Sequence, residues 1–189
     1  TAVTGVNLTD AELTKITTAA GGRMTFGDSS QTGDITFTTA TPATTAGAAI
    51  YAVQSTGGGG KIVLDDDGAG TPGTALAGGS SVIDLTAGTG GITAASANNT
   101  AAEIASTGAT VTLNTTGAIG TSANRIQFAD NTSTTQQKVV VGSANQPSGV
   151  FLDGLGTLTL GNVSTNNGNV DVTARTGLNV NGTLSTGTG

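Results

Sequence analysis

The sequence predicts an all-β protein in which short parallel strands coil into a β-solenoid. Three observations favour this fold: a composition rich in small and β-branched residues, a series of short alternating segments, and a repeat of those segments about every 28 residues. We expect residues 1–189 to form a single solenoid segment that is part of a longer repeat protein.

The composition excludes several classes of protein. The chain has 31 Gly, no His, Trp or Cys, and only 10% charged and 3% aromatic residues. Disordered chains usually combine high charge with few β-branched residues, and this chain has neither property. A net charge of −6 with six scattered basic residues is unsuited to nucleic-acid binding. The lack of His and the low charge are also unusual for an enzyme, and we expect none.

Alternating apolar pairs mark the strands. In each pair two apolar residues are separated by one residue, so both side chains lie on the same face of a strand. The pairs are Ile35 and Phe37, Ile62 and Leu64, Ile83 and Leu85, Val111 and Leu113, Val139 and Val141, Leu158 and Leu160, Val170 and Val172, and Leu178 and Val180. Gly, Asn, Asp or Ser soon follows nearly every pair, so the strands are short.

One core is expected to collect the inward members of these strands. Between two of these inward residues, Thr112 should face outward, because side chains alternate along a strand. The residues expected in this core are Ile83, Leu85, Val111, Leu113, Val170 and Val172.

A supersecondary unit repeats along the chain. Residues 82–92, 111–119 and 170–180 each contain an alternating strand, a short polar link, a Gly and a second apolar start. The interval from Ile83 to Val111 is 28 residues, and the interval from Val111 to Val139 is also 28. The interval from Val139 to Val170 is 31 residues. One such unit cannot bury its apolar stripe alone, whereas stacked units bury a continuous core.

Small residues are expected at the corners of the coil. Gly and Asn tolerate left-handed backbone, and the doublets Asn98–Asn99 and Asn166–Asn167 fall where corners are expected. An antiparallel β-sandwich is the alternative fold, since it also has short strands and frequent turns. The scarcity of large aromatic side chains favours the solenoid, because a sandwich core is thick and needs them.

One segment breaks the β pattern near the N-terminus. Thr9 and Glu12 have the spacing of a capping box, and Leu13 and Ile16 lie three residues apart. The pattern predicts a short helix over residues 10–18 that covers one end of the coil.

Four strings resemble the repeat regions of very large bacterial secreted exoproteins, the filamentous-haemagglutinin-like and autotransporter-like adhesins. They are "LTDAEL", "GAIGTSANRIQF", "SGVFLDGLGTLTLG" and "NVDVTARTGLNVNG". The resemblance implies a right-handed parallel β-helix in a fibre that is secreted or held at the bacterial cell surface. It implies a structural or adhesive function, with flanking repeats and a host or cell-surface glycan or protein as partners. No apolar run is long enough for a membrane span.

Two other functions remain open from the sequence. β-Helices include polysaccharide-processing enzymes, although no aligned pair of carboxylates can be read from the spacing here. Thr-x-Thr pairs, such as those at Thr36, Thr112 and Thr157, would suit an ice-binding face if they formed regular rows. We expect no catalytic residues and no cofactor-binding residues.

The acidic triplet Asp65, Asp66 and Asp67 is the candidate metal site. Carboxylates at this density in a tight loop can supply oxygen ligands to Ca²⁺. The alternative is a solvated acidic turn, because neither an EF-hand nor a calcium-roll repeat is present. Calcium is therefore the single cofactor that the sequence suggests.

The C-terminal stretch "NGTLSTGTG" has strand character but no charged residue, Pro or capping helix. An uncovered solenoid end exposes backbone groups and an apolar core. We therefore expect this end to meet flanking repeats of a longer chain, or to stack head-to-tail on another copy into a filament.

Overall fold

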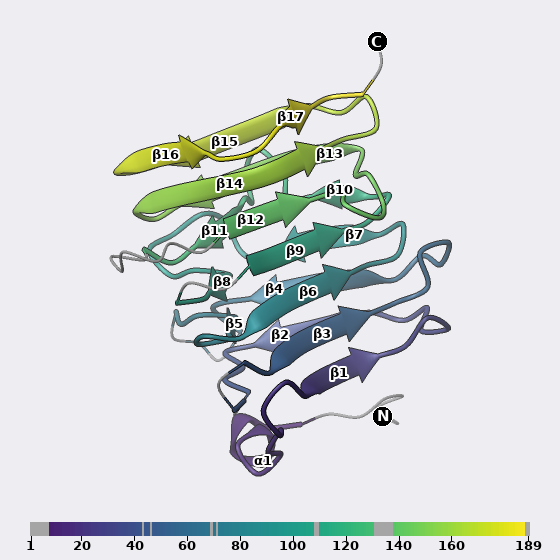
Figure 1. Cartoon of the computed structure of the whole chain (residues 1–189), viewed down its shortest axis with the longest axis vertical. Helices are drawn as coiled ribbons and strands as arrows, with labels where there is room; N and C mark the ends of the chain where they lie inside the picture. The colour runs from purple at the N-terminus through teal and green to yellow at the C-terminus, as the bar shows by residue number, and fades with distance from the viewer. Residues whose placement is uncertain are drawn as a thin grey trace.

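The structure is nearly all β and consists of parallel sheets with one short helix (Figure 1). It is a computed structural model, and it describes residues 8–42, 44–45, 47–68, 70, 72–107, 110–130 and 138–187. In these residues no helix has the length and apolar character needed to cross a membrane.

The first sheet is a stack in which each strand up to β16 pairs with the preceding strand of the same sheet. In Figure 1 this stack rises from β1 near the N-terminus to β16 and β17 near the C-terminus. Its strands are β1 (Arg23–Gly27), β3 (Ala49–Val53), β6 (Val82–Thr86), β9 (Thr110–Asn114), β12 (Lys138–Val141), β14 (Thr157–Ser164), β16 (Gly177–Val180) and β17 (Leu184–Ser185). Both β16 and β17 pair with the long strand β14.

The second sheet contains two ladders that meet at one strand. The first ladder is β2 (Ile35–Thr38), β4 (Lys61–Asp65), β7 (Gly91–Ala94) and β10 (Ala118–Ile119), and the second is β5 (Leu76–Ala77), β8 (Ile104–Ala105) and β11 (Ile126–Phe128). The strand β13 (Gly149–Gly154) pairs with β10 through its first residues and with β11 through its last. On its other side β13 pairs with β15 (Val170–Ala174).

Every strand pair in the described residues is parallel. The antiparallel sandwich is therefore wrong, and the prediction of a parallel, solenoid-like architecture is confirmed. The arrangement is parallel because the chain visits both sheets in each circuit and re-enters each sheet in the same direction.

Two columns of side chains run through the first sheet and form much of the core. The first column is Met24, Ile50, Ile83, Val111, Val139, Leu160 and Val180. The second column is Phe26, Ala52, Leu85, Leu113, Val141, Val163 and Leu184. In the middle of the stack these side chains are fully buried, as predicted for Ile83, Leu85, Val111 and Leu113. Thr112 lies on the opposite face and is half-buried, so the predicted facing is correct.

The repeat interval is confirmed for the middle of the chain and wrong beyond it. Ile83 pairs with Val111 and Val111 with Val139, as the 28-residue spacing predicts. Val139, however, pairs with Leu160, only 21 residues later, and Val170 belongs to the other sheet. The last circuits are shorter because β13 passes directly from one ladder of the second sheet to the other, without the intervening loop found earlier.

Val170 and Val172 are only half-buried at the end of the second sheet. They face the core as predicted, but they are less buried than predicted. The reason is that no further strand of the described residues covers β15. At the corner before β15, Asn167 has a positive φ of 56°, as expected for Asn at a left-handed position.

The helix α1 (Asp10–Leu13) lies at the N-terminal end of the stack (Figure 1). The carboxylate of Glu12 accepts hydrogen bonds from the backbone N–H of Thr9 at 2.9 Å and from its hydroxyl at 2.8 Å. Leu13 is buried in the core, whereas Ile16 is exposed. The predicted extension to residue 18 is wrong. The β-branched residues Ile16, Thr17 and Thr18 disfavour a helix, and their side chains are not buried against the core, so no packing stabilises one.

Candidate functional site

The acidic triplet at the end of β4 is split between three environments. Asp65 accepts a hydrogen bond from the Thr38 hydroxyl at 3.3 Å, Asp66 is fully buried, and Asp67 is exposed. Although Asp67 is exposed, slight desolvation by neighbouring atoms, the charge of Asp66 and a hydrogen bond with Asp65 raise its pKa. Within the described ranges, no three or more His, Cys, Asp or Glu side chains are arranged to hold a metal. The calcium site stays a prediction without support from this geometry.

Asp66 instead belongs to a set of polar side chains buried beneath a loop. We call Asp66, Glu103, Gln127 and Asp153 the acid layer, and residues 95–102 the cover loop. Gln127 lies between two core residues of β11, so its side chain points to the outer face, and it pairs in register with Asp153 of β13. Glu103 directly precedes β8, the neighbouring strand on the other side.

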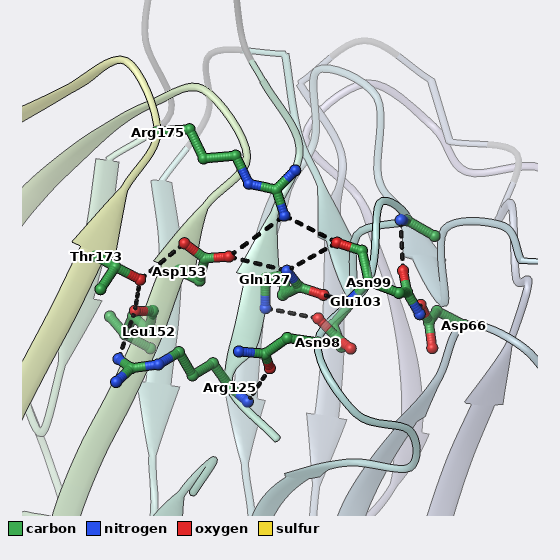
Figure 2. Close-up of polar contacts among 11 residues, drawn as sticks. Asp66, Asn98, Asn99, Glu103, Arg125, Gln127, Leu152, Asp153, Thr173 and Arg175 are labelled. Atoms are coloured by element: carbon green, nitrogen blue, oxygen red, sulfur yellow. Dashed lines mark hydrogen bonds and ion pairs between the residues drawn. The ribbon is translucent and has the colours of Figure 1, made fainter. Parts of the chain in front are cut away.

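Gln127 connects the members of the layer (Figure 2). Its backbone N–H donates to Oε2 of Glu103 at 2.6 Å, and its side-chain amide donates to Oδ2 of Asp153 at 2.8 Å. The other carboxylate oxygen of Asp153 accepts from the Thr173 hydroxyl, also at 2.8 Å. The contacts therefore run across three consecutive strands, β11, β13 and β15.

Asn99 fastens the cover loop onto this layer (Figure 2). Its side-chain amide donates to Asp66 at 2.7 Å, and its backbone N–H donates to the side-chain carbonyl of Gln127 at 2.8 Å. Its carbonyl accepts from Arg175 at 2.8 Å, and the same guanidinium lies 3.7 Å from the carboxylate of Asp153. Ser96 of the loop also donates to Asp66.

Glu103 has the least favourable electrostatic environment in the layer. Its side chain is 0% exposed, and among the described residues its Oε1 atom has no hydrogen-bond partner. Burial, which penalises the charged form, raises the pKa of Glu103 to about 8, and the negative charges of Asp66 and Asp153 add to this effect. Glu103 is therefore mostly protonated at neutral pH.

A second contact crosses the same strands nearby. The guanidinium of Arg125 donates to both carboxylate oxygens of Asp171, at 3.1 and 2.7 Å, and to the carbonyl of Leu152 at 3.3 Å. These hydrogen bonds and the charge of Arg125 lower the pKa of Asp171. The pair ties the start of β11 to β15 across β13.

A shallow hollow of about 480 Å³ opens beside the cover loop. Its lining includes Thr74 and Thr100, and its charged members are Asp130 and Arg175. The carboxyl groups of Glu103 and Asp153 do not line the hollow, because the layer is closed beneath the cover loop.

The C-terminal end of the stack carries exposed apolar side chains. Leu178, Val180 and Leu184, which we call the open edge, are 45, 48 and 44% exposed. They lie in register over Leu158, Leu160 and Val163, all of which are buried. Residues 177–187 contain neither a charged residue nor Pro.

Sequence reasoning missed the acid layer. Glu103, Gln127 and Asp153 are separated in sequence by loops of different length, so their alignment depends on strand register. The one available signal was a polar residue between two buried apolar ones, as in "IQF". Comparisons of the sequence and the structure find no matching family model, no matching curated protein and no matching solved structure.

Proposed function

We propose that the chain is a structural segment of a secreted or cell-surface bacterial fibre, coiled as a right-handed parallel β-solenoid. The segment serves as a stiff stalk whose length increases by about 4.8 Å with each stacked circuit. Bacterial origin, handedness and extracellular location rest on the resemblance of the repeat strings to large secreted adhesins.

The open edge is the observation that carries this proposal. Leu178, Val180 and Leu184 continue buried columns by one more step, so a further parallel strand in the same register would complete their burial. Natural edge strands are usually protected by charged residues, Pro or a covering segment, and residues 177–187 have no charge or Pro. Such an edge fits another circuit of the same kind, supplied by flanking repeats of the chain or by a second copy.

Adhesion is the second part of the proposed function. A regular side wall presents similar surface at each circuit, and many weak contacts to a host or cell-surface glycan or protein then add up through multivalency.

The alternative functions have less support. For a polysaccharide-processing enzyme, the carboxyl groups that lie together in the acid layer are covered, so a polymer would not reach them. For an ice-binding face, the row through Thr112 would need to repeat Thr at each step. That row contains Thr25, Tyr51, Asp84, Thr112 and Val140.

The proposal is tested by placing a charge on the open edge. At high concentration the wild-type chain is expected to associate head-to-tail through this edge. Val180→Lys should abolish the association, since a buried Lys is costly. Val82→Lys is the matched control, because Val82 is 40% exposed in the middle of the stack. Sedimentation velocity over a range of concentrations measures the outcome.

Two results would contradict the proposal. One is a wild-type chain that stays monomeric at all concentrations, which would mean that the open edge does not accept another strand. The other is equal association of the Val180→Lys and Val82→Lys variants, which would place the contact elsewhere on the molecule.

A further inference from the structure

We propose that the acid layer is a pH-dependent latch, in which protonated Glu103 keeps the cover loop closed and ionisation of Glu103 loosens it. This inference concerns the side of the stack and is independent of the open edge. It rests on three features of the layer: its burial, its surplus of carboxyl groups and the way Asn99 attaches the loop.

The first feature is that no cation of the described residues pairs with Glu103. Its Oε2 atom accepts a hydrogen bond from the Gln127 backbone, while within the described residues Oε1 is buried without a partner. A buried carboxylate is stable only when it is paired or accepts several hydrogen bonds. Ionisation of Glu103 in the closed state is therefore strongly unfavourable.

The second feature is the sign of the surrounding charge. The loop after β4 contributes Asp66, with Asp65 and Asp67 on either side, and β13 contributes Asp153. The cation at this site is Arg175, which follows β15, and it is directed to Asn99 and Asp153. A charge on Glu103 would therefore face carboxylates on both sides.

The third feature is that the loop is the movable part. The strands β8, β11 and β13 are held by backbone ladders. The cover loop has backbone hydrogen bonds at its two ends, through Ala95 and Ala102, and between these ends it is held by the side-chain contacts of Ser96, Asn98 and Asn99. Opening residues 96–101 would admit water to Glu103 without breaking these backbone hydrogen bonds. It would also move a wall of the adjoining hollow, which Thr100 and Ala101 line.

Linkage gives the pH range of the effect. A water-exposed Glu ionises near pH 4.5, whereas burial raises the pKa of Glu103 in the closed state to about 8. The open form therefore binds fewer protons than the closed form between these values. Its population relative to the closed form should rise roughly tenfold per pH unit from about pH 5 to 8, and level off above 8.

Amide hydrogen exchange measures this directly. Reporter amides are those of Asn99, which donates to Gln127, and of Gln127, which donates to Glu103. Intrinsic exchange rises tenfold per pH unit, so the wild-type rates should rise about a hundredfold per unit between pH 5.5 and 7.5. In Glu103→Gln, which cannot ionise, they should rise only tenfold per unit. The matched control is Glu12→Gln, since Glu12 and Glu103 are the two Glu of the chain and Glu12 lies on α1.

The possible outcomes either support or overturn the latch. A tenfold dependence in the wild type, or a hundredfold dependence in Glu103→Gln, would overturn it. So would equal exchange rates for Asn99 and for the core amide of Leu85, because the whole chain would then be unfolding. If Glu103→Gln does not fold, carbon NMR of the wild-type Glu103 carboxyl decides: a midpoint near pH 8 supports the latch, and one near pH 4.5 overturns it.

Discussion

The middle and the end of the first sheet are built from the same pattern but have different environments. In β9, "TVTLN" places Val111 and Leu113 in the core with no exposed surface, whereas in β16, "GLNV" leaves Leu178 and Val180 nearly half exposed. Both strands alternate, and both pair in parallel with a preceding strand. The difference is that β9 has a strand on each side and β16 has one.

This difference teaches that alternation and burial have separate causes. The pleat of the backbone decides which face of the sheet a side chain occupies, whereas stacking of another circuit decides how much water it still contacts. Substitutions that are chemically alike should therefore have unequal effects in the two regions.

The largest difference is expected for loss of an inward Leu. Leu113→Ala should lower the free energy of unfolding by about 2–5 kcal/mol, because it removes a fully buried side chain and leaves a cavity. Leu178→Ala should cost less than about 1 kcal/mol, since the side chain it removes is already largely hydrated. Urea denaturation followed by circular dichroism measures both, and equal losses would contradict the contrast.

A smaller difference is expected at the glycines. A Cβ at Gly117, in the corner after β9, would lie 2.7 Å from the backbone nitrogen of Gly91 and against the carbonyl of Thr89. At Gly177, the first residue of β16, the nearest atom would be 3.7 Å away. Gly117→Ala should therefore cost about 1–3 kcal/mol, and Gly177→Ala should be close to neutral. Thermal denaturation of the two variants measures both effects. A destabilised Gly177→Ala variant would show that the start of β16 is also crowded.

The ion pair between Arg125 and Asp171 should contribute about 1 kcal/mol to the free energy of unfolding, because Asp171 is partly exposed and screened by water. Asp171→Asn should destabilise the chain at pH 7. Because the folded-state pKa of Asp171 is lowered, its contribution is present above the ordinary range of a carboxyl group and is lost as the pH falls through the lowered value. The difference in the free energy of unfolding between Asp171→Asn and the wild type should therefore become smaller as the pH is lowered. A difference in the free energy of unfolding that does not narrow as the pH falls would mean that the variant acts through packing.

The smallest effect is expected for the outward residue of β9. Thr112→Val should change the free energy of unfolding by less than about 0.5 kcal/mol, because Thr112 faces away from the core. Val111→Thr, which places the reverse change on the buried face, is the control and should be clearly destabilising. If the two variants reversed in rank, the strand would face the other way.

Several features of the fold could be predicted from the sequence because they are local. Alternation predicted the facing of Ile83, Leu85, Val111 and Leu113, and the first two 28-residue intervals predicted correct strand partners. The Thr9 and Glu12 spacing correctly predicted where the helix begins. Each of these features depends on residues within one strand, one turn or one regular repeat.

Only the tertiary structure decided the features that depend on loop length and on neighbours. The pairing of Val139 with Leu160 follows from the direct passage of β13 between two ladders, which no local pattern signals. The acid layer forms because Gln127 and Asp153, on two neighbouring strands, align with Glu103, just before a third strand, under one loop. Sequence determined which face each side chain occupies, since the pleat alternates at every residue. The stacking of circuits determined which of those side chains are buried, since burial requires a neighbouring circuit that the local sequence does not specify.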